Sequence, residues 1–367
     1  MNASCSQSNL LYALNIVNKA ISPNHTLPVL NNILIKANNK KLFLSATNLE
    51  IAISCDIEAS LSIEGSVTVP AKLLTNYISL LNDEEVQLKL KENLELEIKS
   101  SKSNTKIKCI SADEFPLIPK IEKEKEFKIN INDFYKSLNE TVFSASINTT
   151  RPVLSGVFMK SEDKILKIVA TDSYRLAEKK MNLDEKIDDI SCIVPAKTMV
   201  EISRILSKAE EKYIKINISK NQILFSVDGI ELISRLIEGN FPEYEKIIPQ
   251  TEKTRLTVSK EDLILTLKRV SLFARENNNS IKLEISKENK MTVSSEETKI
   301  GEEKADLGIE CLGEDNEISL NSQYLLDVLN IIDGEKVDLI LNERVSPVCV
   351  KSVEEDGYIY IIMPLKA

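Results

Sequence analysis

The sequence repeats itself at an interval of about 125 residues, and this periodicity limits the fold more than any other feature. Residues 69–72 read Val-Pro-Ala-Lys and return unchanged as residues 194–197. A repeat of this length is as long as a whole domain, so the chain of 367 residues is expected to consist of three related domains. The weaker matches keep the same order: residues 26–30 with 150–154, 46–48 with 170–172, 115–116 with 241–242, and a fainter third copy at 294–296, 319–322 and 363–364.

Two polar, charged stretches lie where the repeats meet. Residues 122–126 and 249–253 are rich in Lys, Glu, Gln and Thr and lack apolar periodicity, which is typical of the joints between domains. We therefore expect domains at residues 1–124, 125–251 and 252–367.

Apolar residues follow two different periods within each repeat. Strict alternation predicts strands with one buried face, whereas helical spacing predicts amphipathic helices that lie on a sheet. The clearest expected strands are residues 86–91, 94–99, 214–219, 281–286 and 337–341. The expected helices, two in each repeat, are residues 7–19, 71–81, 132–146, 196–208, 260–275 and 320–332. Asn132 and Ser259 are candidate helix N-caps. The predicted fold class is α+β, with three repeated domains of two strand-helix-strands units each.

The composition excludes several classes of protein. Hydrophobic residues make up 43% and charged residues 28% of the chain, which is typical of a globular protein. With His25 as the single histidine and six scattered cysteines, neither a metal site nor a histidine-dependent hydrolase is expected. Phosphate-binding glycine motifs are missing, so no cofactor is expected. No apolar run is long enough to cross a bilayer, and the first residues do not form a signal peptide, so we expect a cytoplasmic protein without a membrane partner.

The distribution of charge is uneven. The net charge is −9, which argues against a nucleic-acid partner if the charge is spread evenly. However, the six expected helices contain only 6 of the 56 acidic residues and carry a net positive charge. A surface formed by these helices would tolerate a polyanion. Alternatively, their Asn-, Ser- and Lys-rich faces are simply solvated.

Several strings of residues resemble the bacterial sliding clamps, the beta subunits of replicative DNA polymerases. The resemblance extends over essentially the whole chain and rests on residues 26–34, 46–50, 151–156, 170–177, 241–249 and 360–365. It implies a non-catalytic homodimer in which two three-domain protomers meet head to tail. Each protomer would form half of a closed ring around duplex DNA, which it would contact without regard to sequence.

The resemblance also assigns residues that face DNA. They are basic or polar: Lys72, Asn148, Thr149, Arg151, Lys197 and Arg204, to which helix position adds Lys268 and Arg269. Asn24 stands where some relatives have arginine, and the neighbouring His25 is expected to be a surface loop residue.

A groove between the second and third domains is implied to bind short linear peptides. The partners implied are the replicative polymerase alpha subunit, the clamp loader and other replication and repair proteins with a clamp-binding motif. The matching positions are mainly apolar: Leu154, Thr171, Ser173, Tyr174, Arg175, Leu176, Pro242, Ile247, Val345, Pro347, Ile361, Ile362, Met363, Pro364 and Leu365. Asp172 and Arg175 are expected to form a structural ion pair.

The contact between the two protomers is implied to use Ile107, on an edge strand of the first domain, and Leu272 with Phe273 in the third. Burial of the last two residues within their own domain is the alternative. Two other functions remain open: a three-domain peptide-binding scaffold that does not encircle DNA, and an enzyme, for which Asp172 and scattered carboxylates are the only candidates.

Overall fold

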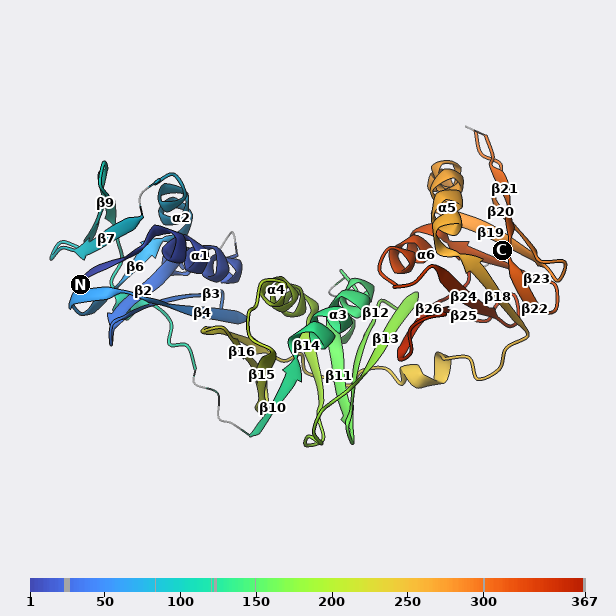
Figure 1. The fold of residues 1–367 in the computed structure, drawn as a ribbon, viewed down its shortest axis with the longest axis horizontal. Coiled ribbons are helices and arrows are strands. Elements are labelled where there is room, and N and C mark those ends of the chain that lie inside the picture. The colour runs from blue at the N-terminus through green and yellow to red at the C-terminus, as the bar shows by residue number, and fades with distance from the viewer. Residues whose placement is uncertain are drawn as a thin grey trace. The chain divides into compact units, whose positions relative to one another are not determined.

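The computed structural model describes residues 1–22, 27–82, 84–119, 121, 124–148, 150–299 and 301–365. Within these ranges the chain forms two compact units, which are considered separately. The first contains Met1–Asn132 and Glu201–Leu236, and the second contains Asp133–Val200 and Ile237–Ala367. Each expected helical segment contains one α-helix (Figure 1). The helices are α1 (Gln7–Val17), α2 (Ala71–Ser79), α3 (Ile131–Thr141), α4 (Ala196–Leu206), α5 (Lys260–Ala274) and α6 (Ser322–Leu329).

Two antiparallel sheets form the first unit. An eight-stranded sheet has the order β10-β15-β16-β17-β4-β3-β2-β6, and a five-stranded sheet has the order β5-β1-β7-β8-β9. The larger sheet contains β2 (Asn32–Asn38), β3 (Lys41–Thr47), β4 (Ile51–Glu58), β6 (Gly65–Pro70), β10 (Lys125–Asn130), β15 (Tyr213–Ile218), β16 (Gln222–Val227) and β17 (Ile230–Arg235). The smaller sheet contains β1 (Asn2–Ser6), β5 (Ser60–Ile63), β7 (Glu85–Leu90), β8 (Glu95–Lys99) and β9 (Asn104–Lys108).

Antiparallel sheets also form the second unit. A nine-stranded sheet has the order β14-β11-β12-β13-β26-β25-β24-β18-β22, and a four-stranded sheet has the order β21-β20-β19-β23. The larger sheet contains β11 (Gly156–Glu162), β12 (Ile165–Thr171), β13 (Arg175–Asn182), β14 (Ser191–Pro195), β18 (Thr254–Ser259), β22 (Glu310–Gly313), β24 (Lys336–Leu341), β25 (Val348–Ser352) and β26 (Tyr358–Ile362). The smaller contains β19 (Ser280–Ser286), β20 (Lys290–Ser295), β21 (Lys304–Gly308) and β23 (Asn316–Asn321).

The large sheet of each unit joins strands from two of the repeats. In the first unit β17 pairs with β4, so that Ile233 lies opposite Ala52. In the second unit β26 pairs with β13, and Ile361 lies opposite Leu176. Each pairing uses backbone hydrogen bonds to join sequence segments that are far apart. Ala52 and Leu176 occupy equivalent positions of the repeat, and so do Ile233 and Ile361. The two strand pairs therefore have equivalent registers.

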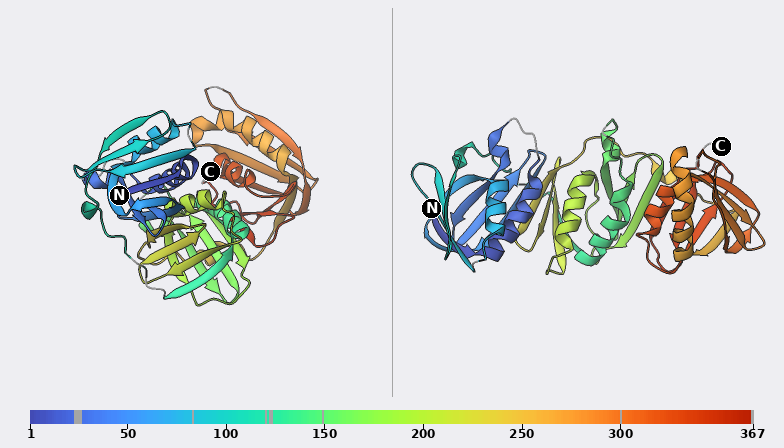
Figure 2. Two further views of the ribbon diagram at one scale, coloured as in Figure 1. Left: turned by 60° about the vertical axis from the view of Figure 1, so that its left-hand side comes forward. Right: turned by 90° about the horizontal axis from the view of Figure 1, so that it is seen from above.

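The helices pack against the sheets through their apolar stripes. Helices α1 and α2 contact each other, and α1 also contacts β3 and β4 (Figures 1 and 2). Leu10 and Leu14 of α1 are completely buried, as their helical spacing predicts. In the second unit, α5 contacts α6 and the small sheet. Among the described residues, no helix has the length and apolar character needed to span a membrane.

Most of the strands and helix caps predicted from the sequence are confirmed, but one predicted helix cap is not. The five clearest strand predictions correspond to β7, β8, β15, β19 and β24. Ser259 caps α5, because its hydroxyl accepts the Asp262 N–H at 3.3 Å. The prediction that Asn132 caps the third helix is wrong. Helix α3 begins one residue earlier, and the side-chain oxygen of Asn130 accepts the N–H of Asn132 at 2.9 Å.

Candidate functional site

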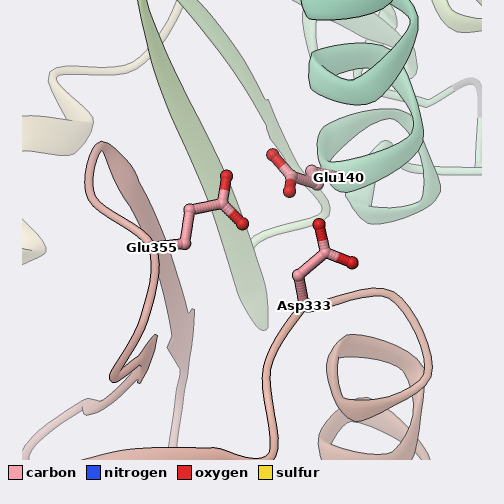
Figure 3. Close-up of side chains that lie close together, drawn as sticks. All are labelled: Glu140, Asp333 and Glu355. Atoms are coloured by element: carbon pink, nitrogen blue, oxygen red, sulfur yellow. The ribbon is translucent and has the colours of Figure 1, made fainter.

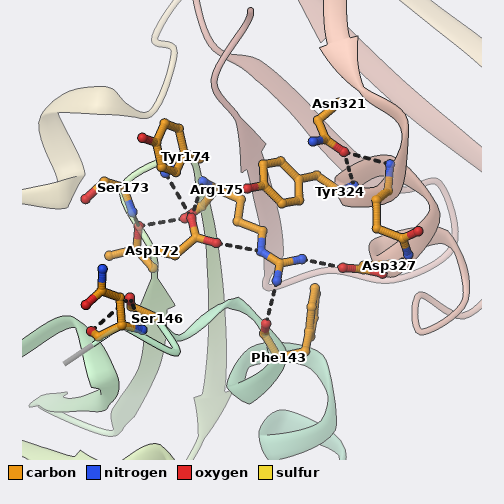
Figure 4. Close-up of polar contacts among 12 residues, drawn as sticks. Phe143, Ser146, Asp172, Ser173, Tyr174, Arg175, Asn321, Tyr324 and Asp327 are labelled. Carbon is orange, nitrogen blue, oxygen red and sulfur yellow. Dashed lines mark hydrogen bonds and ion pairs between the residues drawn. The ribbon is translucent and has the colours of Figure 1, made fainter. Parts of the chain in front are cut away.

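A tight turn between β12 and β13 shapes one side of the candidate peptide groove. The Thr171 hydroxyl donates to the carbonyl oxygen of Arg175 at 2.6 Å. The Asp172 carboxylate accepts the backbone N–H groups of Tyr174 and Arg175 at 2.9 and 3.0 Å. Ser173, between them, has a φ of 81°, in the left-handed region. The polar side chains of Thr171 and Asp172 therefore fix the turn. Figure 4 shows Asp172 beside Ser173 and Tyr174 in this turn.

Arg175 connects this turn to the third repeat. Its guanidinium forms ion pairs with Asp172 at 3.0 Å and with Asp327 of α6, and it donates to the carbonyl oxygen of Phe143 at 2.9 Å (Figure 4). The same group lies over the rings of Phe143 and Tyr324, at 5.4 and 4.7 Å from their centroids. The expected Asp172–Arg175 ion pair is thus present. These contacts hold the Arg175 side chain in one place beside the turn.

A cavity of about 200 Å³ lies beside the turn. Most of its lining had been expected from the resemblance: Leu154, Thr171, Ser173, Arg175, Leu176, Pro242, Ile247, Ile361 and Met363. Glu243 and Tyr244 also line it and were not predicted. The Tyr244 hydroxyl donates to the buried carboxylate of Glu178 at 2.6 Å, and burial raises the pKa of this tyrosine. The position of Glu243 and Tyr244 directly after Pro242 was the one sequence signal that could have predicted them.

The remaining residues predicted for the groove do not line this cavity. Ile362 is a correction: it lies in the hydrophobic core that includes Leu256 and Leu325, because consecutive residues of a strand point to opposite faces. Its neighbour Ile361 packs with Leu176 and Tyr244 on the cavity side. The others lie outside the lining: Tyr174, Val345, Pro347, Pro364 and Leu365. Of these, Tyr174 is 62% and Val345 is 79% exposed.

The described residues predicted to face DNA are exposed. Lys72 lies on α2, Lys197 and Arg204 on α4, and Lys268 and Arg269 on α5. Asn148 and Arg151 are exposed in the loop that follows α3. Arg204 forms an i,i+3 ion pair with Glu201 at 2.6 Å, which partly neutralises it. Asn24, His25 and Thr149 lie outside the described residues.

The residues predicted for the protomer contact differ in exposure. Strand β9 is an edge strand, as expected, but the Ile107 side chain is only 5% exposed. The edge therefore offers its backbone groups and not this side chain. Leu272 is 55% exposed on α5 and Phe273 is partly buried. Burial within its own domain is thus wrong for Leu272.

An ionic cluster around the buried carboxylate of Glu140 lies elsewhere in the second unit. The carboxylates of Glu140, Asp333 and Glu355 point toward one another, in a geometry that could hold a metal ion (Figure 3). Two ammonium groups compensate them instead: Lys136 contacts all three, and Lys179 contacts Glu140 and Glu355. Burial raises the pKa of Glu140 to about 7. This cluster connects α3 and β13 to the turns before β24 and β26, and its lysines make it an ion-pair network.

Family models and relatives agree with this architecture. The N-terminal, central and C-terminal domain models of the DNA polymerase III beta subunit match residues 1–119, 128–243 and 245–366. The beta sliding clamps of Staphylococcus epidermidis (strain RP62A) and Staphylococcus aureus (strain Mu50) are each 31% identical to this chain over 363 residues, which cover 96% of either chain. The Bacillus subtilis sliding clamp structure has a TM-score of 0.96 at 28% identity and covers 100% of this chain and 99% of its own. The Streptococcus pyogenes beta subunit has a TM-score of 0.96 at 27% identity, with 100% of both chains covered.

The fold is therefore that of a DNA clamp built from three repeated α+β domains. The chain belongs to the DNA polymerase III beta subunit family. Its function is that of a sliding clamp in DNA replication, which is a non-catalytic role. This finding does not favour the alternative of a scaffold that leaves DNA free.

Proposed function

We propose that two copies of this chain close head to tail into a ring that encircles duplex DNA without reading its sequence. The observation that carries this proposal is the exposure of Lys72, Lys197, Lys268 and Arg269 on helices that contain few acidic residues. Lysine and arginine contacts to phosphates are independent of sequence and leave the protein free to slide. The edge strand β9 and the exposed side chain of Leu272 support the protomer contact. The domains would extend over residues 1–124, 125–251 and 252–367, and the ring would work in the cytoplasm.

We further propose that the cavity beside Thr171 and Arg175 takes a linear peptide of a partner protein. The partners would be the polymerase alpha subunit, the clamp loader and other replication and repair proteins. Its wall combines apolar groups, such as Leu154 and Ile361, with a few fixed polar groups, which suits an apolar peptide held in one orientation. Met363 adds a flexible thioether that can adapt to different side chains.

Retention on closed DNA tests the ring. The protein is loaded by the clamp loader onto nicked circular DNA, and the complex is isolated by gel filtration in moderate salt. We expect retention on circles and loss after the DNA is cut to a linear form, because only a closed ring is held by topology. Equal loss from both forms would contradict encirclement.

A further inference from the structure

The turn that shapes the groove occurs a second time, between β3 and β4 of the first unit. The Thr47 hydroxyl donates to the carbonyl oxygen of Ile51 at 2.8 Å, as Thr171 does to Arg175 at 2.6 Å. The side-chain oxygen of Asn48 accepts the N–H groups of Glu50 and Ile51 at 3.0 and 2.9 Å, which is the role of Asp172 in the first turn.

The backbone around the two turns is also equivalent. Leu49 has a φ of 73°, and its counterpart Ser173 has a φ of 81°. The strand that pairs beyond each turn is anchored in the same way: the N–H of Arg235 donates to the carbonyl oxygen of Glu50 at 3.1 Å, and that of Met363 donates to Tyr174 at 2.8 Å. The turn and its paired strand therefore form the same backbone arrangement in both repeats, and we call this arrangement the scaffold.

A cavity of about 90 Å³ lies beside the second turn. Its lining occupies the same positions of the scaffold as the first cavity: the turn, the paired strand and the segment that follows the repeated Phe-Pro. The full lining is Thr47, Leu49, Glu50, Ile51, Ala52, Pro116, Leu117, Ile118, Pro119, Gln222, Ile233 and Arg235. The volume is about half that of the first cavity and suits one aliphatic side chain.

The second cavity differs from the first at several equivalent positions, and three of them change the rim. Leu49 stands in place of Ser173, and Leu117 stands in place of Glu243, so the rim becomes more apolar. Both leucines are exposed, Leu49 by 48% and Leu117 by 97%. Arg235 replaces Met363 and places a positive charge at that position, whereas Ile51 stands where the first cavity has Arg175. Within the described residues, no carboxylate lies within ion-pair distance of the Arg235 guanidinium.

We propose that this second cavity is a docking site for an extended peptide of a partner protein, with an aliphatic side chain in the cavity and an acidic side chain on Arg235. The inference rests on the proposed peptide-binding role of the first groove, whose scaffold it shares. Leu49 exposes an apolar side chain at the rim, and a ligand that covers it would remove this apolar area from water. Glu50 also lines the cavity but forms no ion pair with Arg235, so the unpaired guanidinium attracts an acidic side chain at its own end of the cavity.

Methyl NMR of the full-length protein tests the proposal, with isoleucine and leucine methyls labelled. The probe is the synthetic peptide Ac-Ala-Asp-Leu-Leu-NH₂, and Ac-Ala-Lys-Leu-Leu-NH₂ is its charge-reversed partner. Ile233 and Leu49 report on the second cavity, whereas Ile247 and Ile361 report on the first. We expect the acidic probe to shift the signals of Ile233 and Leu49 with a saturable titration. Shifts at Ile247 and Ile361 without shifts at Ile233 and Leu49 would overturn this inference alone. A lack of shifts at all four residues would overturn both proposals.

Two variants sharpen the test. Arg235→Glu is expected to weaken the acidic probe at Ile233 by about threefold or more, the scale of an exposed ion pair, and to strengthen the lysine probe. Leu117→Ala removes an almost fully exposed side chain and is expected to weaken both probes at the second cavity while folding is unchanged. Leu312→Ala is the matched control, since Leu312 is 71% exposed and lines neither cavity. Equal binding at Ile233 by all three variants and the unmodified protein would overturn the proposal.

Discussion

The ammonium group of Lys179 lies 3.0 Å from the carboxylate of Glu140, and both side chains are almost completely buried. Lys179 belongs to β13 and Glu140 to α3, and both also belong to the ionic cluster with Glu355. Two charges can remain in such a place only because each compensates the other. Their pairing therefore fixes α3 against the large sheet of the second unit.

Removal of the lysine is expected to destabilise the second unit strongly. At pH 8, where Glu140 is ionised, Lys179→Met leaves this carboxylate buried without its nearest counter-charge, which costs about 3–5 kcal/mol in the free energy of unfolding. Urea denaturation followed by circular dichroism measures this loss. Lys186→Ala is the control, because its ion pair with Asp163 is exposed on both sides and contributes less than about 1 kcal/mol. An equal effect of the two substitutions would show that the buried pair has no special role.

The pH dependence of stability is expected to report on Glu140. Burial raises the pKa of this carboxyl from 4.5 to about 7, so the folded state binds its proton more tightly than the unfolded state. The resulting stabilisation is complete below about pH 4.5 and is lost as the pH rises through 7. The groups that face Glu140 are Lys136, Lys179 and Glu355, and the two lysines hold the pKa of Glu355 below its ordinary value although burial opposes them.

Glu140→Gln removes this titration. The variant should gain stability relative to the unmodified protein as the pH is raised from 5 to 8, because only the unmodified protein loses its bound proton. Urea midpoints at several pH values measure the difference. A constant difference across this range would show that Glu140 does not titrate there.

The first groove is expected to depend on residues that line its cavity. Ile247 is 37% exposed at the cavity, so Ile247→Ser keeps the fold but removes apolar contact area. Loss of that contact should weaken binding of the polymerase alpha subunit by about tenfold in surface plasmon resonance, the equivalent of about 1.4 kcal/mol. Val345→Ser is the control, since Val345 is 79% exposed and lies outside the lining. A larger loss with Val345→Ser would move the binding site away from this cavity.

The protomer contact can be tested through Leu272 and Phe273. Two aspartates at these positions would place charge in an apolar contact, and we expect monomers in sedimentation velocity and failure to remain on circular DNA. Leu265→Asp changes another leucine of α5, 53% exposed, and should leave the dimer intact. If the double variant sediments as a dimer, the contact lies elsewhere.

Charge reversal on the helices tests the DNA contacts. Lys197→Glu with Lys268→Glu should lower the salt dependence of DNA binding by about one charge per lysine removed, equally for unrelated sequences. Fluorescence anisotropy with duplexes in increasing salt measures the slope. Lys287→Glu changes an exposed lysine in the turn between β19 and β20 and is the control. An unchanged slope in the double variant would exclude these two lysines from the DNA surface.

Much of this protein follows from its sequence alone. The repeat established three related domains, and helical and alternating spacing located the six helices and the clearest strands, because these patterns depend on neighbours a few residues apart. The turn at Thr171 and Asp172 is likewise held by hydrogen bonds between residues that are close together in the sequence. The resemblance then supplied most of the lining of the first groove.

The tertiary structure alone decided which distant residues share a site. Alternation shows that Ile361 and Ile362 point to opposite faces, but only the pairing of β26 with β13 determines that Ile361 reaches the cavity. Lys136 stands four residues before Glu140 on the same helix, a spacing that the sequence shows, but Lys179 comes from β13, and no spacing in the sequence connects it with Glu140. The second cavity also depends on tertiary structure, because only the pairing of β17 with β4 brings Arg235 and Leu49 into one lining. Short-range periodicity specifies each element, whereas the surface that it presents depends on long-range packing that a single sequence does not encode locally.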